Sequence, residues 1–276
     1  MSDRRENRVV VALGGNAITQ AGETGTIEQD YANLERSLEC VADLVEQGFE
    51  VLLTHGNGPQ VGNQMIRVEV AKDEAPILPL DIMGADIQGG LGYMIERVLW
   101  NKLRRRNSDA SACCMLMMVE VDAKDPAFEK PTKFVGPFFR ADQVARLIQE
   151  REWQMREDVG RGWRRVVPSP VPIDVVEKED VMLLLRTGTV VITGGGGGIP
   201  VCRNEEGELF GIEAVIDKDL TSSVLATDVG AELLVILTAV DGVYLNFGEP
   251  NELRLGAVTL AECERYIEAG HFPPGS

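Results

Sequence analysis

The fold is decided by the stretch Val9-Val10-Val11-Ala12-Leu13-Gly14-Gly15-Asn16. A run of β-branched and aliphatic residues that ends in two glycines is typical of a buried parallel strand entering a tight turn. Glycine adopts positive φ angles and has no Cβ, so a large anion can approach the amide groups of such a turn. A helix after the turn would add unpaired N–H groups and the positive end of its dipole, which favour phosphate.

The same pattern occurs twice more along the chain. Val51–Thr54 leads into His55-Gly56-Asn57-Gly58-Pro59, and Val190–Thr193 leads into five consecutive glycines, Gly194–Gly198. Strands and helices alternate, which predicts an α/β fold with a parallel sheet covered on both faces. Open α/β sheets bind ligands at the carboxyl edge of their strands. We therefore predict three glycine turns lined up along that edge.

These turns differ from the two best-known phosphate motifs. No Gly-Lys-Ser or Gly-Lys-Thr follows them, so none is a P-loop. Gly14-Gly15-Asn16 also lacks the GxGxxG spacing of dinucleotide-binding proteins. A single Gly-Gly after a strand is often only a turn, but three such turns together favour a phosphate site of another design.

The composition excludes several classes of protein. The chain of 276 residues has a net charge of −17, so its average surface repels the phosphates of nucleic acid. Its five cysteines are odd in number and lack CxxC spacing, which argues against a disulfide framework and a zinc site. No apolar run approaches the length of a signal core or a membrane span. We expect a soluble, cytoplasmic protein with no nucleic-acid or membrane partner.

Hydrophobic periodicity predicts the main elements. We expect one helix over residues 26–47, another over 82–103 whose glycines would allow close packing, including packing between subunits, and a buried strand over 113–122. The pattern changes between residues 125 and 170, where prolines flank one short predicted helix over 141–149. We predict that 125–170 is an inserted, protruding lobe or lid.

Charged residues in unusual contexts are the candidate functional groups. Lys218 stands between two carboxylates, Asp217 and Asp219, and Lys133 lies at the foot of the predicted lobe. Phosphoryl transfer needs positive charge on the migrating oxygens and aligned reactants, which such lysines can supply. Either lysine could also be a solvated surface group. His55 could orient a phosphate or be a satisfied turn residue, and the residues alone leave both open.

Two arginine clusters interrupt the acidic background. Arg104–Arg106 end a predicted helix, where cations suit the dipole, so we expect a solvated cap. Arg161, Arg164 and Arg165 lie among glycines and prolines and are the better functional candidates. No serine has the GxSxG context of a hydrolase nucleophile, and two histidines do not make a three-ligand zinc site.

Long motifs over nearly the whole chain resemble those of the carbamate kinases, within the amino-acid kinase superfamily. The matching stretches are Val11–Ala17, Thr54–Gly62, Pro79–Asp81, Asp125–Phe128, Pro131–Lys133, Glu157–Asp158, Gly160–Gly162, Arg164–Pro170, Gly194–Pro200, Glu213–Asp219 and Gly270–Phe272. The resemblance implies a three-layer αβα sandwich around a mainly parallel sheet, with 125–170 protruding from an amino-acid kinase domain over 1–276, and a homodimer. It also implies reversible, Mg²⁺-dependent phosphoryl transfer between ATP and carbamate, giving ADP and carbamoyl phosphate, with ATP formed in the cell during arginine catabolism.

The resemblance also assigns roles to residues of this sequence. Lys133 and Lys218 would be catalytic, and Asp219 would orient the lysines. The phosphoryl group and carbamate would be held by Gly14, Gly15, Asn16, Gly56, Asn57, Gly58, Gly195 and Gly196. The nucleotide would be held by Thr238, Val240, Asp241 and Tyr244. The resemblance gives no metal ligands.

The sequence departs from the family pattern at three places. Ala12 stands where superfamily relatives usually carry a lysine, which Lys133 from the lobe would replace, so that lobe closure would be part of catalysis. Ala239 stands where an aspartate is usual, and the chain ends at Ser276, before a segment in which the family carries another phosphate-binding lysine. The alternatives are therefore a catalytically impaired, shortened nucleotide-binding homologue and a kinase of another small carboxylic or amino acid.

Overall fold

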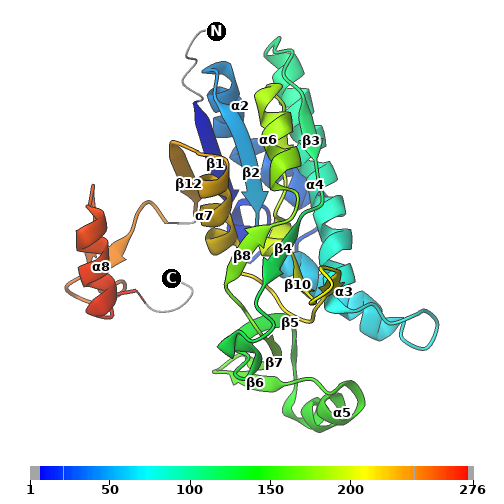
Figure 1. Ribbon diagram of the computed structural model, residues 1–276. Helices are drawn as coiled ribbons and strands as arrows, with labels where there is room; N and C mark the ends of the chain where they lie inside the picture. Colours follow the sequence, from blue (N-terminus) through cyan, green and yellow to red (C-terminus); the bar gives the residue numbers. More distant parts are fainter. Residues whose placement is uncertain (1–6, 21, 239, 273–276) are drawn as a thin grey trace. The chain divides into compact units, whose positions relative to one another are not determined.

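The computed structural model describes residues 7–20, 22–238 and 240–272 (Figure 1). The chain divides into two compact units at the bond between Leu237 and Thr238. Ala239, one of the departures noted above, lies outside the described residues. Among the described helices, none is long and apolar enough to cross a membrane.

A parallel sheet forms the centre of the first unit. Within the described residues its strand order is β12-β1-β2-β9-β3, and every neighbouring pair is parallel. The strands are β1 (Arg8–Leu13), β2 (Glu50–His55), β3 (Ala112–Cys114), β9 (Val190–Ile192) and β12 (Leu233–Leu237). The opening stretch of the sequence is thus an interior strand, and all six residues of β1 are buried.

Alternate residues of the sheet pack against helices on its two faces. Val9 and Val11 join a core with side chains of α1, α2 and α4, whereas Val10 joins a second core with side chains of α6 and α7. The helices are α1 (Ile27–Ser37), α2 (Glu39–Glu46), α3 (Gly58–Val70), α4 (Leu80–Arg105), α6 (Lys178–Arg186) and α7 (Lys218–Asp228). This period-2 alternation produces the predicted three-layer αβα arrangement.

Two predicted elements are each divided in the structure. The predicted helix over 26–47 breaks at Leu38, whose ψ of 3° separates α1 from α2. The predicted strand over 113–122 is β3 followed by β4 (Met118–Val121), which belongs to a different sheet. Met117 between them is fully buried. The sequence stays apolar because the chain passes from one buried sheet to the next, so periodicity alone does not mark the bend.

The second sheet has the order β11-β10-β4-β8 within the described residues. Its other strands are β8 (Pro172–Val175), β10 (Ile199–Arg203) and β11 (Leu209–Gly211). Strand β10 runs parallel to β4 and antiparallel to β11, and β8 is antiparallel to β4. This sheet therefore supplies the mixed part of a mainly parallel fold.

Residues 133–167, here called the lobe, form a separate sheet. The lobe contains β5 (Lys133–Phe139), α5 (Ala141–Arg151), β6 (Met155–Asp158) and β7 (Gly162–Val167), with strand order β5-β7-β6. A short 3₁₀ helix, η2 (Pro126–Phe128), precedes it. Its own sheet agrees with the predicted insertion, and the boundaries 125 and 170 remain a prediction.

The second unit begins at Thr238 and is small. Its elements are the antiparallel pair β13 (Tyr244–Leu245) and β14 (Leu253–Arg254), followed by α8 (Leu260–Glu268). Thr259 opens α8 with a capping box, because its hydroxyl accepts from the Glu262 N–H while the Glu262 carboxylate accepts from the Thr259 N–H.

Candidate active site

The first and second glycine turns are in direct contact. The Gly56 N–H donates to the Leu13 carbonyl at 2.9 Å, which joins the end of β2 to the end of β1. A Cβ on Gly56 would lie only 2.9 Å from the Gly15 nitrogen, closer than real Cβ atoms approach. The glycine at position 56 is therefore required by the close approach of the two backbones. Helices η1 (Gly15–Ala17) and α3 begin directly after these turns.

The third glycine turn packs against the second. A Cβ on Gly195 would lie 2.4 Å from Cε1 of His55, and one on Gly196 would lie 2.2 Å from Nδ2 of Asn57. The backbone of this turn is left-handed at Gly194, Gly196, Gly197 and Gly198, with φ between 65° and 94°. Side chains disfavour that conformation, so the glycine run is a requirement of the turn itself. The structure thus brings the three turns together, as the sequence predicted.

The start of α7 completes the cluster. A Cβ on Gly197 would lie 2.4 Å from the Ile216 carbonyl oxygen, and the Thr221 hydroxyl donates to the Gly197 carbonyl at 2.8 Å. The hydroxyls of Thr54 and Ser222 are 2.7 Å apart and tie α7 to β2. The three turns and the N-terminus of α7 therefore pack together in one cluster.

Both candidate lysines lie at this helix N-terminus. Asp217 is the N-cap of α7 and accepts from the Asp219 N–H at 2.9 Å. Lys133, from β5 of the lobe, donates to Oδ2 of Asp217 at 2.9 Å, and Lys218 donates to Oδ1 of Asp219 at 2.6 Å. The side chain of Lys218 is only 14% exposed. Two residues 85 positions apart in sequence thus place their ammonium groups on neighbouring carboxylates.

The electrostatics of this corner favour the charged form of Asp217. Burial raises the pKa of Asp217, but the hydrogen bond and positive charge of Lys133 outweigh burial and hold that pKa below its usual value. The N-terminus of α7 adds the positive end of its dipole to the two ammonium groups. Asp217 and Asp219 balance the charges of the two lysines, so the helix N-terminus and the ammonium N–H groups are what this corner offers to an anion.

His55 is a buried, neutral side chain. Burial lowers its pKa to about 4, and the positive charge of Lys218 acts in the same direction, whereas its hydrogen bond to the Gly56 carbonyl opposes the change. Its Nδ1 is 3.1 Å from that carbonyl oxygen, which assigns the proton to Nδ1. The His55 ring packs against Gly195 of the third glycine turn. This geometry favours the interpretation of His55 as a turn residue.

The arginines of the lobe separate into two groups. Arg161 and Arg164 both face Asp158 inside the lobe, at 2.8 Å and 3.8 Å. Arg165 instead reaches out of the lobe to Glu213, which precedes α7, at 2.5 Å. Only the last of these three connects the lobe to the segment that carries Asp217 and Lys218.

Sequence reasoning assigned the carboxylates only in part. It expected Asp219 to orient both lysines, whereas in the structure Asp219 pairs with Lys218 and Asp217 pairs with Lys133. Glu213 was not singled out by itself. The pattern Asp217-Lys218-Asp219 pointed to Asp217. The partner of Asp217 is Lys133 on β5 of the lobe, and the sequence alone does not show that these two residues meet.

Comparison with known proteins gives the same family from sequence and from structure. A model of the amino acid kinase family matches residues 7–273. The chain belongs to the amino acid kinase family. It is 45% identical to the carbamate kinase of Pyrococcus horikoshii and 46% identical to that of Thermococcus kodakarensis, in each case over 98% of this chain and 86% of the relative. It is similar in structure to the carbamate kinase of Giardia lamblia bound to AMP-PNP, with a TM-score of 0.92 and 38% identity over 99% of this chain and 86% of that one.

The nucleotide residues expected in this amino acid kinase belong to the second unit. There the Thr238 hydroxyl donates to the Val240 carbonyl at 2.8 Å, and the Tyr244 hydroxyl donates to Asp241 at 2.5 Å. Arg254 also pairs with Asp241, at 3.2 Å. These four residues thus form a local turn, and their contact with nucleotide remains a prediction.

The residues described for this amino acid kinase offer no ready-made metal cage. Among residues 7–20, 22–238 and 240–272, no group of three or more His, Cys, Asp and Glu side chains could hold a metal ion. The carboxylates at the start of α7, Asp217 and Asp219, are already paired with lysines. The side chains of the described residues therefore do not by themselves form a site that would hold a metal ion.

Proposed function

We propose that the chain is a carbamate kinase that transfers a phosphoryl group reversibly between ATP and carbamate. The single observation that carries the proposal is the placement of Lys133 on Asp217, beside Lys218 and at the start of α7, against which the third glycine turn packs. Relatives of 45% and 46% identity that carry the name carbamate kinase support carbamate as the acceptor.

The reaction suits a site of amides and ammonium groups. A carbamate oxygen attacks the γ-phosphorus, an O–P bond forms, and the bond from phosphorus to the β–γ bridging oxygen breaks, so that ADP leaves with the electron pair. The attacking oxygen is already anionic, so no proton has to be removed and no general base is needed. The difficulty is to bring two anions together, and Lys133 and Lys218 reduce that repulsion.

Each predicted residue then has a physical task. The backbone amides of Gly14, Gly15, Gly56 and Gly58, with Asn16 and Asn57, would hold the transferred group and carbamate, and Gly195 and Gly196 would border the phosphates. Asp217 and Asp219 fix the two ammonium groups in place. Thr238, Val240, Asp241 and Tyr244 would contact ATP or ADP. The solved relative from Giardia lamblia was bound to AMP-PNP, which supports a nucleotide site in this chain.

We further propose that the reaction uses Mg²⁺, that the protein is cytoplasmic, and that it forms ATP in the cell, as in arginine catabolism. Mg²⁺ typically binds through substrate phosphates with few protein carboxylates, and it would neutralise phosphate charge there. The carboxylates of this site are paired with lysines, so we assign no step to the ion. The cysteine content supports the location, and breakdown of carbamoyl phosphate would supply ATP.

A coupled assay of ATP formation from ADP and carbamoyl phosphate tests the activity. We expect turnover by the unaltered chain, loss of turnover in Lys218→Ala with an unchanged circular dichroism spectrum, and no turnover with N-acetylglutamate and ATP. Near-normal rates in Lys218→Ala would reject the assigned role. Activity with N-acetylglutamate in place of carbamate would identify a kinase of another acid, and ADP binding without any turnover would identify an impaired homologue.

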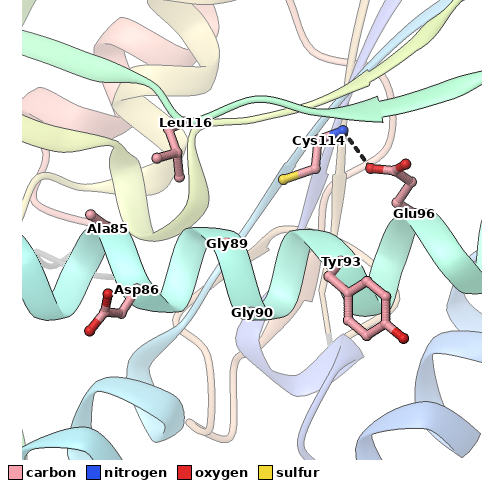
Figure 2. Close-up of a pocket in the computed structure, with 8 residues that line it drawn as sticks. All are labelled: Ala85, Asp86, Gly89, Gly90, Tyr93, Glu96, Cys114 and Leu116. Atoms are coloured by element: carbon pink, nitrogen blue, oxygen red, sulfur yellow. Dashed lines mark hydrogen bonds between the residues drawn. The ribbon is translucent and has the colours of Figure 1, made fainter.

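We further propose that the chain forms a homodimer through the exposed face of α4. A cavity of about 490 Å³ lies on this face, and Figure 2 shows it between α4 and the segment that carries Leu116. Gly89 and Gly90 line the cavity, and Tyr93 and Leu116 beside them are half-exposed. Glu96, which also lines it, accepts from the Cys114 N–H at 2.8 Å. Small residues beside exposed apolar side chains suit close helix contact between two copies.

The oligomeric state tests this surface. In light scattering after gel filtration, we expect a dimer for the unaltered chain and a monomer for Leu116→Asp. Val171→Asp, at another exposed apolar position that does not line this cavity, should remain a dimer. A monomeric parent protein, or a dimeric Leu116→Asp variant, would contradict the proposed surface.

A further inference from the structure

Glu213 joins three parts of the first unit. Its Oε1 accepts from the Leu80 N–H at 2.9 Å, and its Oε2 accepts from Nη2 of Arg165 at 2.5 Å. Leu80 is the first residue of α4, whose N-cap, Pro79, provides no side-chain acceptor. Glu213 therefore caps the central helix with one oxygen and holds the lobe with the other.

Arg165 and Lys133 extend from the same face of the lobe. In the antiparallel pair β5–β7, Lys133 is opposite Val167 and Val135 is opposite Arg165. Directly opposed residues share a face, and so do residues two apart in one strand. Both cations therefore point toward the segment that runs from Glu213 to Asp219.

That segment holds each of these cations on a separate carboxylate. Arg165 is on Glu213 and Lys133 is on Asp217, four residues later. The backbone adds a third link, because the Val215 N–H donates to the Pro168 carbonyl at 3.0 Å. The base of the lobe is thus attached to the body at Glu213, Val215 and Asp217, which are alternate residues of one short stretch of chain.

Beyond this base, a cavity lies between α5 of the lobe and the helices α3 and α4, while β5 of the lobe packs directly on α3. The cavity has a volume of about 660 Å³, and Arg165, Glu213 and Trp153 contribute to its lining. On another part of its wall, Arg151 of α5 pairs with Glu69 of α3 at 3.0 Å. The lobe therefore contacts the body along α3 as well as through this base, and the base is the part that carries Lys133.

We propose that the Arg165–Glu213 pair is a clamp that positions Lys133 for phosphoryl transfer. Both are positioning residues, because they act on the reaction through the placement of Lys133 on Asp217. Arg165 is only 9% exposed, so loss of the opposing carboxylate leaves a buried charge unpaired and displaces the base of the lobe. The proposal rests on the proposed function in one respect, namely the role of Lys133.

The kinetic test uses Glu213→Gln, which keeps an oxygen for the Leu80 N–H but removes the negative charge opposite Arg165. We expect kcat for ATP formation to fall by about tenfold, with KM for ADP changed by less than about twofold. Arg165→Lys, which retains a cation, should recover most of the rate lost in Arg165→Gln. Glu120→Gln, which breaks a similar pair with Arg203 on the second sheet, should keep the parental kcat.

A second readout does not depend on activity. The guanidinium of Arg165 lies 4.8 Å from the ring centroid of Trp153, so Trp153 reports on the clamp. In a Trp100→Phe/Trp163→Phe background, we expect Glu213→Gln to shift Trp153 emission to the red and to increase its quenching by acrylamide. The midpoint of urea unfolding is measured on the same samples.

The outcomes separate the clamp from the proposed function. An unchanged Trp153 spectrum together with parental kcat in Glu213→Gln would overturn the clamp. A fall in kcat that Arg165→Lys does not recover relative to Arg165→Gln would also overturn it, because the charge pair would not be the cause. If the parent protein has no kinase activity, the proposed function fails, and the fluorescence result alone decides whether the clamp holds the lobe.

Discussion

At the scale of single residues, the candidate active site combines tightly packed and more exposed groups. His55, Gly56, Gly195 and Gly196 are enclosed by their neighbours, whereas the side chain of Lys133 comes from the lobe and is 37% exposed. A group delivered by a separate element contributes only when that element is correctly placed. The two lysines therefore depend on different parts of the chain.

Lys133→Met tests the role of the lobe lysine. We expect kcat to fall by about a hundredfold or more, because one ammonium group is lost from the transferring phosphoryl group. The dissociation constant of ADP, measured by calorimetry, should change by less than about threefold. Lys130→Met, at an exposed position close in sequence, is the matched control. An equal loss of turnover and of ADP affinity would move Lys133 into the nucleotide site.

The buried His55 makes stability depend on pH. Its pKa is about 4 in the folded protein and about 6.5 when unfolded, so the unfolded chain binds the proton first as the pH falls. The stabilisation is complete above pH 6.5 and is lost between pH 6.5 and 4, by up to about 3 kcal/mol.

Urea unfolding at several pH values measures this loss. In His55→Gln, whose side chain does not titrate, the decrease in unfolding free energy over the same interval should be smaller by about that amount. If the parent and His55→Gln lost equal stability over that interval, His55 would not be the titrating group.

How much of the site could be predicted depends on the range of the interaction. The glycine turns follow their strands directly, so local sequence predicted both their existence and their common edge. Asp217 was visible only as a neighbour of Lys218, and its pairing with Lys133 spans 84 positions in the chain. The residues next to Glu213 in the sequence do not indicate its role, because its two partners lie in α4 and in the lobe.

At the scale of elements, α4 and β3 approach each other at a single glycine. A Cβ on Gly92 would lie 1.9 Å from Sγ and 3.1 Å from Cβ of Cys114. We expect Gly92→Ala to reduce the free energy of unfolding by about 1–3 kcal/mol, because the thiol must move and the backbones remain crowded. Thermal and urea unfolding provide the measurement.

Two further variants control this prediction. Gly84→Ala, in the same helix but with open space at the added Cβ, should stabilise by up to about 1 kcal/mol, since alanine is the better helix former. Cys114→Ala should recover part of the loss when combined with Gly92→Ala. Equal effects of Gly92→Ala and Gly84→Ala would show that the close approach has no cost.

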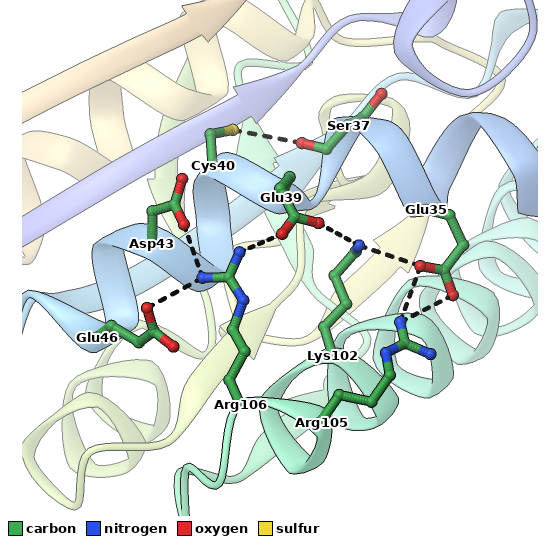
Figure 3. Close-up of polar contacts among 9 residues, drawn as sticks. All are labelled: Glu35, Ser37, Glu39, Cys40, Asp43, Glu46, Lys102, Arg105 and Arg106. Carbon is green, nitrogen blue, oxygen red and sulfur yellow. Dashed lines mark hydrogen bonds and ion pairs between the residues drawn. The ribbon is translucent and has the colours of Figure 1, made fainter.

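A network of charges joins α1 and α2 to the C-terminal end of α4 (Figure 3). Lys102 pairs with Glu35 at 3.0 Å and with Glu39 at 2.5 Å, and its side chain is only 7% exposed. Arg106 contacts Glu39, Asp43 and Glu46. The arginines expected to be a solvated helix cap are thus partly used as links between helices.

Removal of the two sides of this network should have unequal effects. Lys102→Met deletes a charge and leaves an apolar stem, so we expect a loss of about 1 kcal/mol or less. Glu35→Gln/Glu39→Gln leaves the buried ammonium of Lys102 without its carboxylates and should cost more than Lys102→Met. Asp109→Asn, which breaks an exposed pair with Arg104, should cost almost nothing. Equal losses in the first two variants would contradict the unequal cost.

The same network predicts acid sensitivity. Hydrogen bonds from Lys102 and Arg106 lower the pKa of Glu39 to about 2. Its contribution is therefore present above the unfolded value of about 4.5 and is lost as the pH falls toward 2. In Glu39→Gln, the slope of stability against pH below 4.5 should be reduced, as measured by thermal unfolding.

At the scale of the whole molecule, ligand binding should be visible in stability. Because the proposed substrate ADP would bind the folded chain, ADP at a hundred times its dissociation constant should stabilise it by about 2.7 kcal/mol. Differential scanning fluorimetry measures the shift, which Lys133→Met should retain. The absence of any shift at millimolar ADP would count against a nucleotide site.

The layered architecture was predictable because it depends on patterns that repeat along the chain. Val9–Leu13 read as a buried strand, and the alternation of strands with helices gave the αβα arrangement. The crossing from β3 to β4 was missed, because Met115, Leu116 and Met117 continue the apolar run without a glycine or proline. Sequence periodicity reports burial, and it does not report which sheet a buried segment joins.

The mutual contact of the three glycine turns also limits how this protein can evolve. Gly56, Gly195 and Gly196 each face a neighbouring turn at a distance that excludes even a methyl group. Point substitutions there would disrupt the site before they could reshape it. Change in this corner is therefore open at positions such as Gly15 and Gly58, where an added Cβ meets no neighbour.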